Sequence, residues 1–127
     1  MAFSKDDIDI DGYIEELKML VNQNWYHIDF SRIKNKKFLE KYSFEDQDIR
    51  DVLISLKSCD FVERKKTQDY KYKSDYLYVF KKNLCLDDLE SENELDSVVE
   101  VIIYIKTSIP PGDSYKTMIV VSFHEDE

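Results

Sequence analysis

Apolar residues near the start of the chain recur at the spacing of an amphipathic helix. Five of them are separated by one, three or four positions: Tyr13, Ile14, Leu17, Leu20 and Val21. This spacing places them on one side of a helix that we expect over residues 12–24. The stretch from Trp25 to Phe30 that follows is aromatic and irregular, and no element is predicted there.

Two further helices are expected in the first half of the chain. A short helix is predicted over residues 31–41, with Ile33 and Phe38 facing inward. Ser43 stands three residues before an aspartate, as in a capping box. This pair predicts the start of a third helix, which would cover residues 44–57.

The second half of the chain has the composition of β-strands. A strand is expected at Phe61–Lys66, and three runs rich in aromatic and β-branched residues predict further strands: Asp75–Phe80, Val98–Thr107 and Thr117–Phe123. The run beginning at Val98 is nearly continuous in apolar residues, which is typical of a central strand. Pro-Pro-Gly within residues 109–114 predicts a turn that joins the last two strands as a hairpin. Helices followed by strands indicate an α+β class, with N-terminal helices packed on a small antiparallel sheet.

The length of the chain fits one domain. It has 127 residues, of which 43% are hydrophobic and 13% aromatic, so residues 1–127 are expected to form a single domain with its own core. Two acidic segments are expected outside that core: a lead-in over residues 1–11 and a solvated loop over residues 86–97. The two cysteines do not form a disulfide framework and are expected to be reduced.

The net charge of −9 is unevenly distributed. Residues 31–82 carry 14 Lys and Arg against nine Asp and Glu, whereas both ends are acidic. The total argues against a general nucleic-acid coat protein and against a protein held to anionic lipids, because both need a positive surface. No apolar stretch reaches the roughly 20 residues that span a bilayer, and the acidic N-terminus lacks the apolar region of a signal peptide. We therefore expect a cytoplasmic protein that binds neither membranes nor, directly, DNA.

The sequence offers no sign of a metal or cofactor. No Cys or His residues have the spacing of metal ligands, and there is no Gly-rich phosphate loop. Neither a metal nor a cofactor is predicted. Any catalysis would then use side-chain acids and bases.

Two pairs of residues in the predicted strands have the period of side chains that share a face. Tyr104 and Lys106 are two residues apart, and so are Ser122 and His124 at the end of the last strand. A histidine placed there could act as a general acid or base near neutral pH. The first pair also fits an ordinary half-exposed strand face, and the histidine fits an ordinary surface residue.

A metal-free ribonuclease would combine such residues with cations and aromatic rings. It needs a group that deprotonates the ribose 2′-OH, cations that stabilise the charged transition state, and an acid for the leaving 5′-oxygen. Tyrosine rings could stack on the bases of single-stranded RNA. The candidates for these contacts are Arg64, Lys65, Lys66, Lys71, Lys73, Tyr78, Lys81, Lys82 and Lys106.

Three segments, in order along the chain, resemble the MqsR toxin family. Asp51–Phe61 resembles the family's VI-x-x-L-x-x-x-DF block, Ile103–Lys106 its VYLK strand, and Val120–Glu125 its closing IVSFKE strand. The resemblance covers roughly residues 43–125. It implies a RelE-like fold and a metal-independent toxin of a toxin–antitoxin system, an endoribonuclease that cleaves mRNA and is held inactive by a partner antitoxin protein.

The resemblance also implies roles for individual residues. Tyr104 matches the family's strand tyrosine that supports cleavage, as a positioning group or a base. The family's C-terminal lysine falls on His124, which would be the general acid. A family lysine shortly after the DF pair falls on Glu63, which cannot stabilise an anionic transition state. Arg64 and Lys65 would then form the phosphate clamp.

A non-catalytic hypothesis stays open beside this one. The chain would then be an acidic interaction protein on a RelE-like scaffold that binds a basic protein or mimics nucleic acid with its negative charge. Its working surface would be the acidic segments, including the carboxylates at positions 90, 92, 94 and 96, rather than the basic middle. An unrelated α+β domain is the third possibility.

Overall fold

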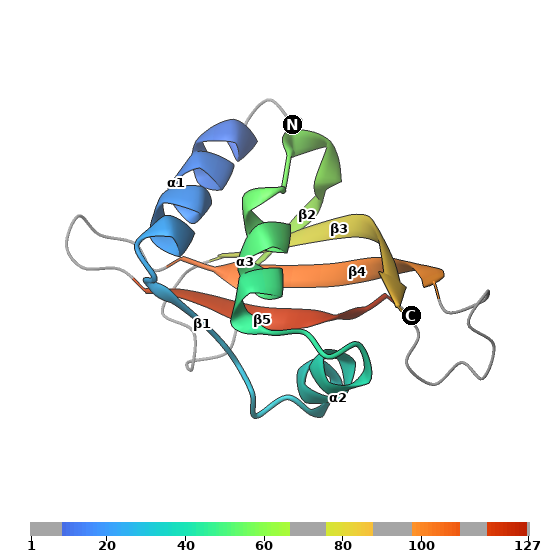
Figure 1. The fold of residues 1–127 in the computed structure, drawn as a ribbon. Helices are drawn as coiled ribbons and strands as arrows, with labels where there is room; N and C mark the ends of the chain where they lie inside the picture. Colours follow the sequence, from blue (N-terminus) through green and yellow to red (C-terminus); the bar gives the residue numbers. More distant parts are fainter. Residues whose placement is uncertain (1–8, 67–75, 88–97, 110–116, 127) are drawn as a thin grey trace.

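Helices dominate the first half of the chain and strands the second half in the computed structural model (Figure 1). The structure describes residues 9–66, 76–87, 98–109 and 117–126. In chain order its elements are α1 (Ile10–Asn22), β1 (Tyr26–Ile28), α2 (Ile33–Lys41), α3 (Asp46–Ile54), the short 3-10 helix η2 (Ser58–Asp60), β2 (Phe61–Lys66), β3 (Tyr76–Asp87), β4 (Val98–Ser108) and β5 (Met118–Glu125). The expected α+β class is confirmed.

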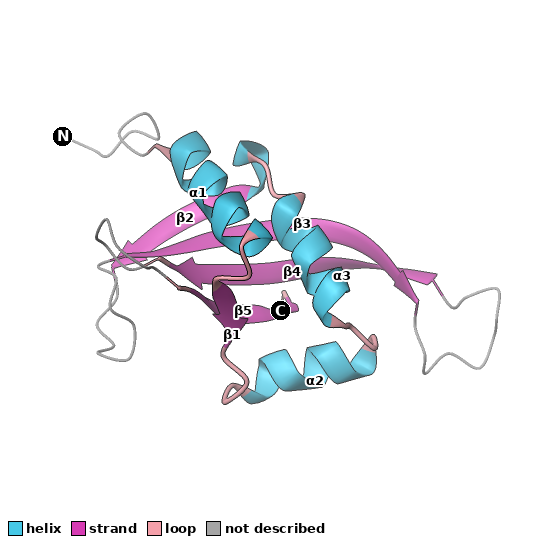
Figure 2. Ribbon diagram, turned by 60° about the vertical axis from the view of Figure 1, so that its left-hand side comes forward, coloured by secondary structure: helices cyan, strands magenta, loops and turns pink. Residues whose placement is uncertain are grey.

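The five strands form one sheet in the order β1-β5-β4-β3-β2. β4 lies at its centre, as the apolar run beginning at Val98 predicts, and all neighbours are antiparallel except β1, which runs parallel to β5. Figure 2 shows α1 and α3 side by side over one face of the sheet, with α2 set apart from them beside β5. We call the sheet surface turned away from α1 and α3 the distal face.

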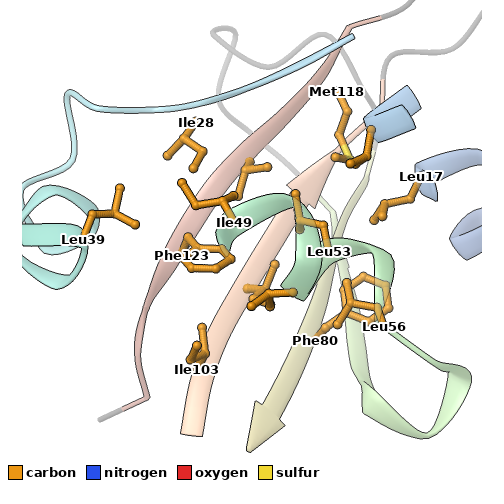
Figure 3. Close-up of a cluster of buried hydrophobic side chains, with 14 of the residues drawn as sticks. Leu17, Ile28, Leu39, Ile49, Leu53, Leu56, Phe80, Ile103, Met118 and Phe123 are labelled. Carbon is orange, nitrogen blue, oxygen red and sulfur yellow. The ribbon is translucent and has the colours of Figure 1, made fainter. Parts of the chain in front are cut away.

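The core lies between the helices and the sheet (Figure 3). Leu17 of α1 and Leu53 of α3 are fully buried against strand residues that include Phe80, Ile103 and Phe123. The buried apolar residues on α3 follow its predicted helical stripe, because positions three and four apart share one side of a helix.

Helix α2 contacts this core through fewer residues than the sequence predicts. Phe38 is buried as expected and packs edge-on against Phe123, with ring centroids 5.9 Å apart. Ile33 is 68% exposed, so its predicted inward position is wrong. The first turn of α2 instead buries a polar residue, Asn35, which is completely inaccessible to solvent.

Ser43 ends α2 and does not begin α3, which corrects the predicted capping box. Its φ of 50° is in the left-handed region, and the N–H of Phe44 reaches back to the carbonyl of Leu39 at 2.9 Å. This is the hydrogen bonding of a Schellman motif, which satisfies carbonyls at a helix C-terminus. The N-terminus of α3 is capped at Glu45, two residues after Ser43, where the N–H of Glu45 donates to the carboxylate of Asp48 at 2.9 Å.

Several element limits differ from the prediction. Strand β1 occupies part of the irregular aromatic stretch, and α3 ends at Ile54, before the short helix η2. Strand β3 continues to Asp87, so the predicted acidic loop loses its first two residues to the sheet, and the acidic lead-in loses its last two to α1. Residues 1–8 and 88–97 of these acidic segments, and most of the predicted turn at 109–114, lie outside the described residues.

Asn35 fixes α2 to the edge of β5 beyond the point where β1 ends. The last backbone hydrogen bond of that parallel pairing runs from the N–H of Asp29 to the carbonyl of Val120, at 3.0 Å. The Asn35 amide then donates to the Val121 carbonyl at 2.9 Å and accepts from the Phe123 N–H at 2.8 Å. A single side chain thus replaces a strand partner, and it places α2 directly beside β5.

Strand β5 contains a bulge within this segment. Thr107 of β4 pairs with Val120, whereas the preceding residue, Lys106, pairs with Ser122. Val121 is therefore the extra residue on β5, and such an extra residue changes which face the following side chains point to. No helix among the described residues is long and apolar enough to cross a membrane.

Candidate functional site

The alternation of side chains along β4 separates the core from the candidate site. Ile103 and Ile105 are fully buried in the main core, so Tyr104 and Lys106, whose side chains alternate with them, point to the distal face. The expectation that these two residues share a face is confirmed. Both are partly exposed, as a contact with a ligand requires.

A first row of side chains crosses the distal face at Tyr104. The cross-strand partners of this residue are Lys81 on β3 and His124 on β5. The rings of Tyr104 and His124 are stacked, with centroids 5.5 Å apart and an angle of 19° between their planes. Lys81 forms an ion pair with Asp126 at 3.1 Å.

The orientation of the His124 ring is set by a backbone contact. Its Nδ1 lies 2.9 Å from the carbonyl oxygen of Glu125. Because a carbonyl can only accept a hydrogen bond, this contact assigns the proton to Nδ1 and leaves Nε2 as the nitrogen that exchanges a proton.

A second row lies two residues further along the strands. It joins Val79 of β3, Lys106 of β4 and Ser122 of β5. The hydroxyl of Ser122 is buried and accepts a hydrogen bond from Nη1 of Arg32 at 3.4 Å. Arg32 directly precedes α2, so the attachment of that helix to β5 brings the guanidinium group close to Lys106.

Lys106 is held in a site that disfavours its positive charge. Partial burial lowers its pKa below the ordinary value of 10.5, and the nearby charges of Arg32 and Lys65 lower it further. Positive charges that lie close together and are partly shielded from water repel one another, and the binding of an anion between them relieves this repulsion. The three cations, which come from three separate segments, therefore form a place where a phosphate group would be stabilised.

Glu63 is the carboxylate nearest to this cluster along β2. It pairs with Val79 in the register, so its side chain belongs to the same row as Lys106. Its Oε1 lies 3.5 Å from Nζ of Lys65, and both side chains are half exposed. The glutamate thus partly neutralises the cation that the sequence assigns to the phosphate clamp.

The predicted site residues do not all meet on the distal face. Tyr104, His124, Lys65, Lys81 and Lys106 have positions in the register that place them there. Lys71 and Lys73 lie outside the described residues.

The remaining predicted residues lie toward the helices. Arg64 pairs with Tyr78, and its guanidinium group lies 4.1 Å from the centre of the Tyr76 ring; Lys66 pairs with Tyr76 on the same side. The Tyr78 ring stacks on Tyr13 at 3.7 Å in the core, so this ring already has an aromatic partner.

Lys82 has a structural role on the helix-covered side. Its ammonium group bonds to the Ser55 carbonyl at 3.2 Å and to the Asp60 carboxylate at 3.4 Å. Both partners of the ion pair are mostly buried, with side-chain exposures of 19% and 16%. The contact links β3 to the segment that follows α3, away from the Tyr104 row.

Sequence reasoning missed Arg32 and the basic residues of α2. The helix sequence IKNKKFLEK is rich in lysine, but this pattern also fits a solvated helix. Only the contact of α2 with β5 gives these residues a functional context, and Asn35, which makes that contact, has no recognisable sequence signal. Among the described residues, no three His, Cys, Asp or Glu side chains gather as a metal site would require.

No family model matches the chain, and neither does any curated protein or solved structure. The resemblance to MqsR toxins and the RelE-like fold therefore stay predictions.

Proposed function

We propose that the protein is a metal-independent endoribonuclease that cleaves single-stranded mRNA on the distal face of its sheet. The observation that carries the proposal is the stacked pair Tyr104–His124 in the row next to Lys106. An acid–base group and a cationic anion site lie two residues apart on the same strands, a separation of about 7 Å. That is a suitable distance for two groups that act on one phosphodiester and its neighbouring ribose.

The reaction is an attack of the ribose 2′-oxygen on the adjacent phosphorus. The 2′-OH loses its proton, a 2′,3′-cyclic phosphate forms, and the bond to the 5′-oxygen of the next nucleotide breaks. Protonated His124 gives the proton at Nε2 to this leaving oxygen. Tyr104 positions the 2′-OH while solvent takes its proton or, in the deprotonated form, accepts that proton itself. Lys106 and Arg32 stabilise the negative charge on the phosphorus centre.

The biological setting of the proposal is a toxin–antitoxin pair with a RelE-like toxin. The three segments that resemble the MqsR family support this, and the α+β order of elements agrees with it. A partner antitoxin would have to cover the distal face or displace one of its residues. Induced expression should then arrest growth, and a small neighbouring gene should relieve the arrest.

The catalytic proposal is tested with a labelled single-stranded RNA and purified protein in the presence of EDTA. Wild-type protein should give fragments that end in a 2′,3′-cyclic phosphate and begin with a 5′-OH. The substitution His124→Ala should lower the rate by about 10²-fold or more, because it removes a general acid. His27→Ala is the matched control, since His27 is exposed on β1 and belongs to neither row.

Two results would overturn the proposal. One is the absence of cleavage by the wild-type protein over a range of RNA sequences. The other is equal cleavage by the wild-type protein and the His124→Ala variant, which would exclude the histidine from the mechanism.

A further inference from the structure

A hollow of about 160 Å³ lies between α2 and the end of β5. Its lining combines three lysines of the helix with two aromatic residues and the end of the strand: Lys34, Lys37, Lys41, Phe38, Tyr42, His124 and Glu125. The histidine that stacks on Tyr104 therefore also borders a second, basic site. The hollow continues the candidate site from the distal face toward α2.

The helical period gathers the three lysines. Positions 34, 37 and 41 are three and four residues apart, so they form one stripe along α2. The hydrogen bonds of Asn35 to Val121 and Phe123 fix the helix beside β5 and thereby fix this stripe beside His124. Lys36 points elsewhere, because it lines a different hollow formed with α3.

The charge of the hollow is suited to an anion. Three lysines and a single carboxylate, that of Glu125, are among the residues that line it, and Oε1 of Glu125 accepts a hydrogen bond from the Tyr42 hydroxyl at 3.4 Å. The Lys41 ammonium lies 5.2 Å from the centre of the Tyr42 ring. The volume of the hollow is well above the roughly 10–15 Å³ that a cavity needs to hold one water molecule, so a phosphate group fits in it.

We propose that this hollow binds the phosphate on the 3′ side of the scissile bond, so that the RNA strand continues from the distal face onto α2. The inference rests on the proposed function for its direction. In the proposed reaction, His124 protonates the leaving 5′-oxygen, which belongs to the nucleotide that follows the cleaved bond. A hollow that shares His124 and lies beyond it receives the next phosphate of that nucleotide.

The site is tested with a 2′-O-methylated dinucleotide, which cannot be cleaved, in forms with and without a 3′-phosphate. Wild-type protein should bind the phosphorylated form about tenfold more tightly, as expected for charge-assisted contacts. The substitutions Lys34→Gln, Lys37→Gln and Lys41→Gln should each reduce this preference, and the triple variant should abolish it. Lys36→Gln, on the same helix, should retain it in full.

The inference is overturned if the 3′-phosphate does not change the affinity of the wild-type protein, or if the preference survives in the triple variant. Because binding is measured without cleavage, the result is independent of the catalytic proposal. A preference that depends on the three lysines, together with no cleavage of ordinary RNA, would support this site and overturn the proposed ribonuclease. Cleavage of ordinary RNA without any 3′-phosphate preference would support the proposed ribonuclease and overturn this phosphate site.

Discussion

The side chain of Asn35 accepts a hydrogen bond from the backbone N–H of Phe123 at 2.8 Å, in a place where no solvent reaches. The same amide donates to the carbonyl of Val121, so it satisfies two backbone groups of β5 that have lost their strand partner. The contact supports both the sheet edge and the position of α2.

Replacing this amide should destabilise the protein strongly. Asn35→Ala leaves the buried backbone groups of Val121 and Phe123 without partners, at a cost of about 3 kcal/mol in the free energy of unfolding. Urea denaturation measures the change. Asn22→Ala is the control, because that residue is exposed at the end of α1 and should change stability by no more than ~0.5 kcal/mol. A loss below about 1 kcal/mol in Asn35→Ala would show that water or a neighbour takes over the role of the amide.

Removing the charge of Glu63 should strengthen RNA binding. Glu63→Gln releases Lys65 from its 3.5 Å ion pair and removes a negative charge from the row of Lys106. The affinity for single-stranded RNA should rise by a few-fold, and it should fall more steeply with added salt, since one more cation contacts phosphate. Filter binding at several salt concentrations measures both effects. Glu15→Gln, an exposed acid on α1, should leave them unchanged; an unchanged affinity in Glu63→Gln as well would mean that RNA does not approach this row.

The lowered pKa of Lys106 should make RNA binding sensitive to alkaline pH. Burial and the charges of Arg32 and Lys65 make this lysine lose its proton below the ordinary value of 10.5, and the neutral amine no longer attracts phosphate. As the pH rises, RNA affinity should therefore begin to fall at a lower pH than it would if Lys106 had the ordinary pKa of a lysine. Lys106→Arg should remove this fall, because the guanidinium group stays charged. Identical pH profiles for the two proteins would place the titrating group elsewhere.

Tyr13 should determine part of the stability at high pH. Its hydroxyl donates to Thr107 at 2.7 Å, and burial raises its pKa above the ordinary 10.0. In the unfolded chain the same hydroxyl ionises near its ordinary value, so the protein loses stability as the pH rises above that value. Below it, the raised pKa has no effect on stability.

The substitution Tyr13→Phe isolates this contribution. At about pH 8 the variant should be less stable than the wild type by about 1 kcal/mol, because one hydrogen bond is lost. At about pH 11 the difference should shrink or change sign, since only the wild type still has to keep this hydroxyl protonated. Urea denaturation at the two pH values gives the comparison. A difference that is the same at both would show that Tyr13 ionises equally in the folded and unfolded chains.

Much of the sheet, and the position of Tyr104 and Lys106 on its distal face, could be predicted from the pattern of apolar and polar residues along short segments. The period-two spacing of Tyr104 and Lys106 and the apolar character of their strand are both properties of a few neighbouring residues, and the structure confirms them. Strand β1 could not be predicted in this way, because three residues are too few for a period and its partner, β5, lies some 90 residues away in sequence. Ser43 illustrates a related difficulty, since a polar residue between two helices can end the first or begin the second.

The cations around the site were harder to predict than its rings. Arg32 and the α2 lysines resemble those of any solvated helix, and their relation to Lys106 and His124 depends on a tertiary contact made by Asn35. The predicted basic residues of the β2–β3 region lie on both faces of the sheet, because residues next to each other in a strand point in opposite directions. A run such as Arg64–Lys66 therefore cannot act as one clamp.

The bulge at Val121 determines on which face of the sheet the side chain of His124 lies. Met118 and His124 are six positions apart, and with strict alternation an even number would turn both side chains to the same face. The extra residue reverses this parity, so that Met118 enters the core while His124 meets Tyr104. If the strand kept all its residues but paired without the bulge, Phe123 and His124 would exchange faces. The irregular pairing at Val121, rather than the alternation of side chains along β5, therefore decides that a histidine and not a phenylalanine reaches the distal face.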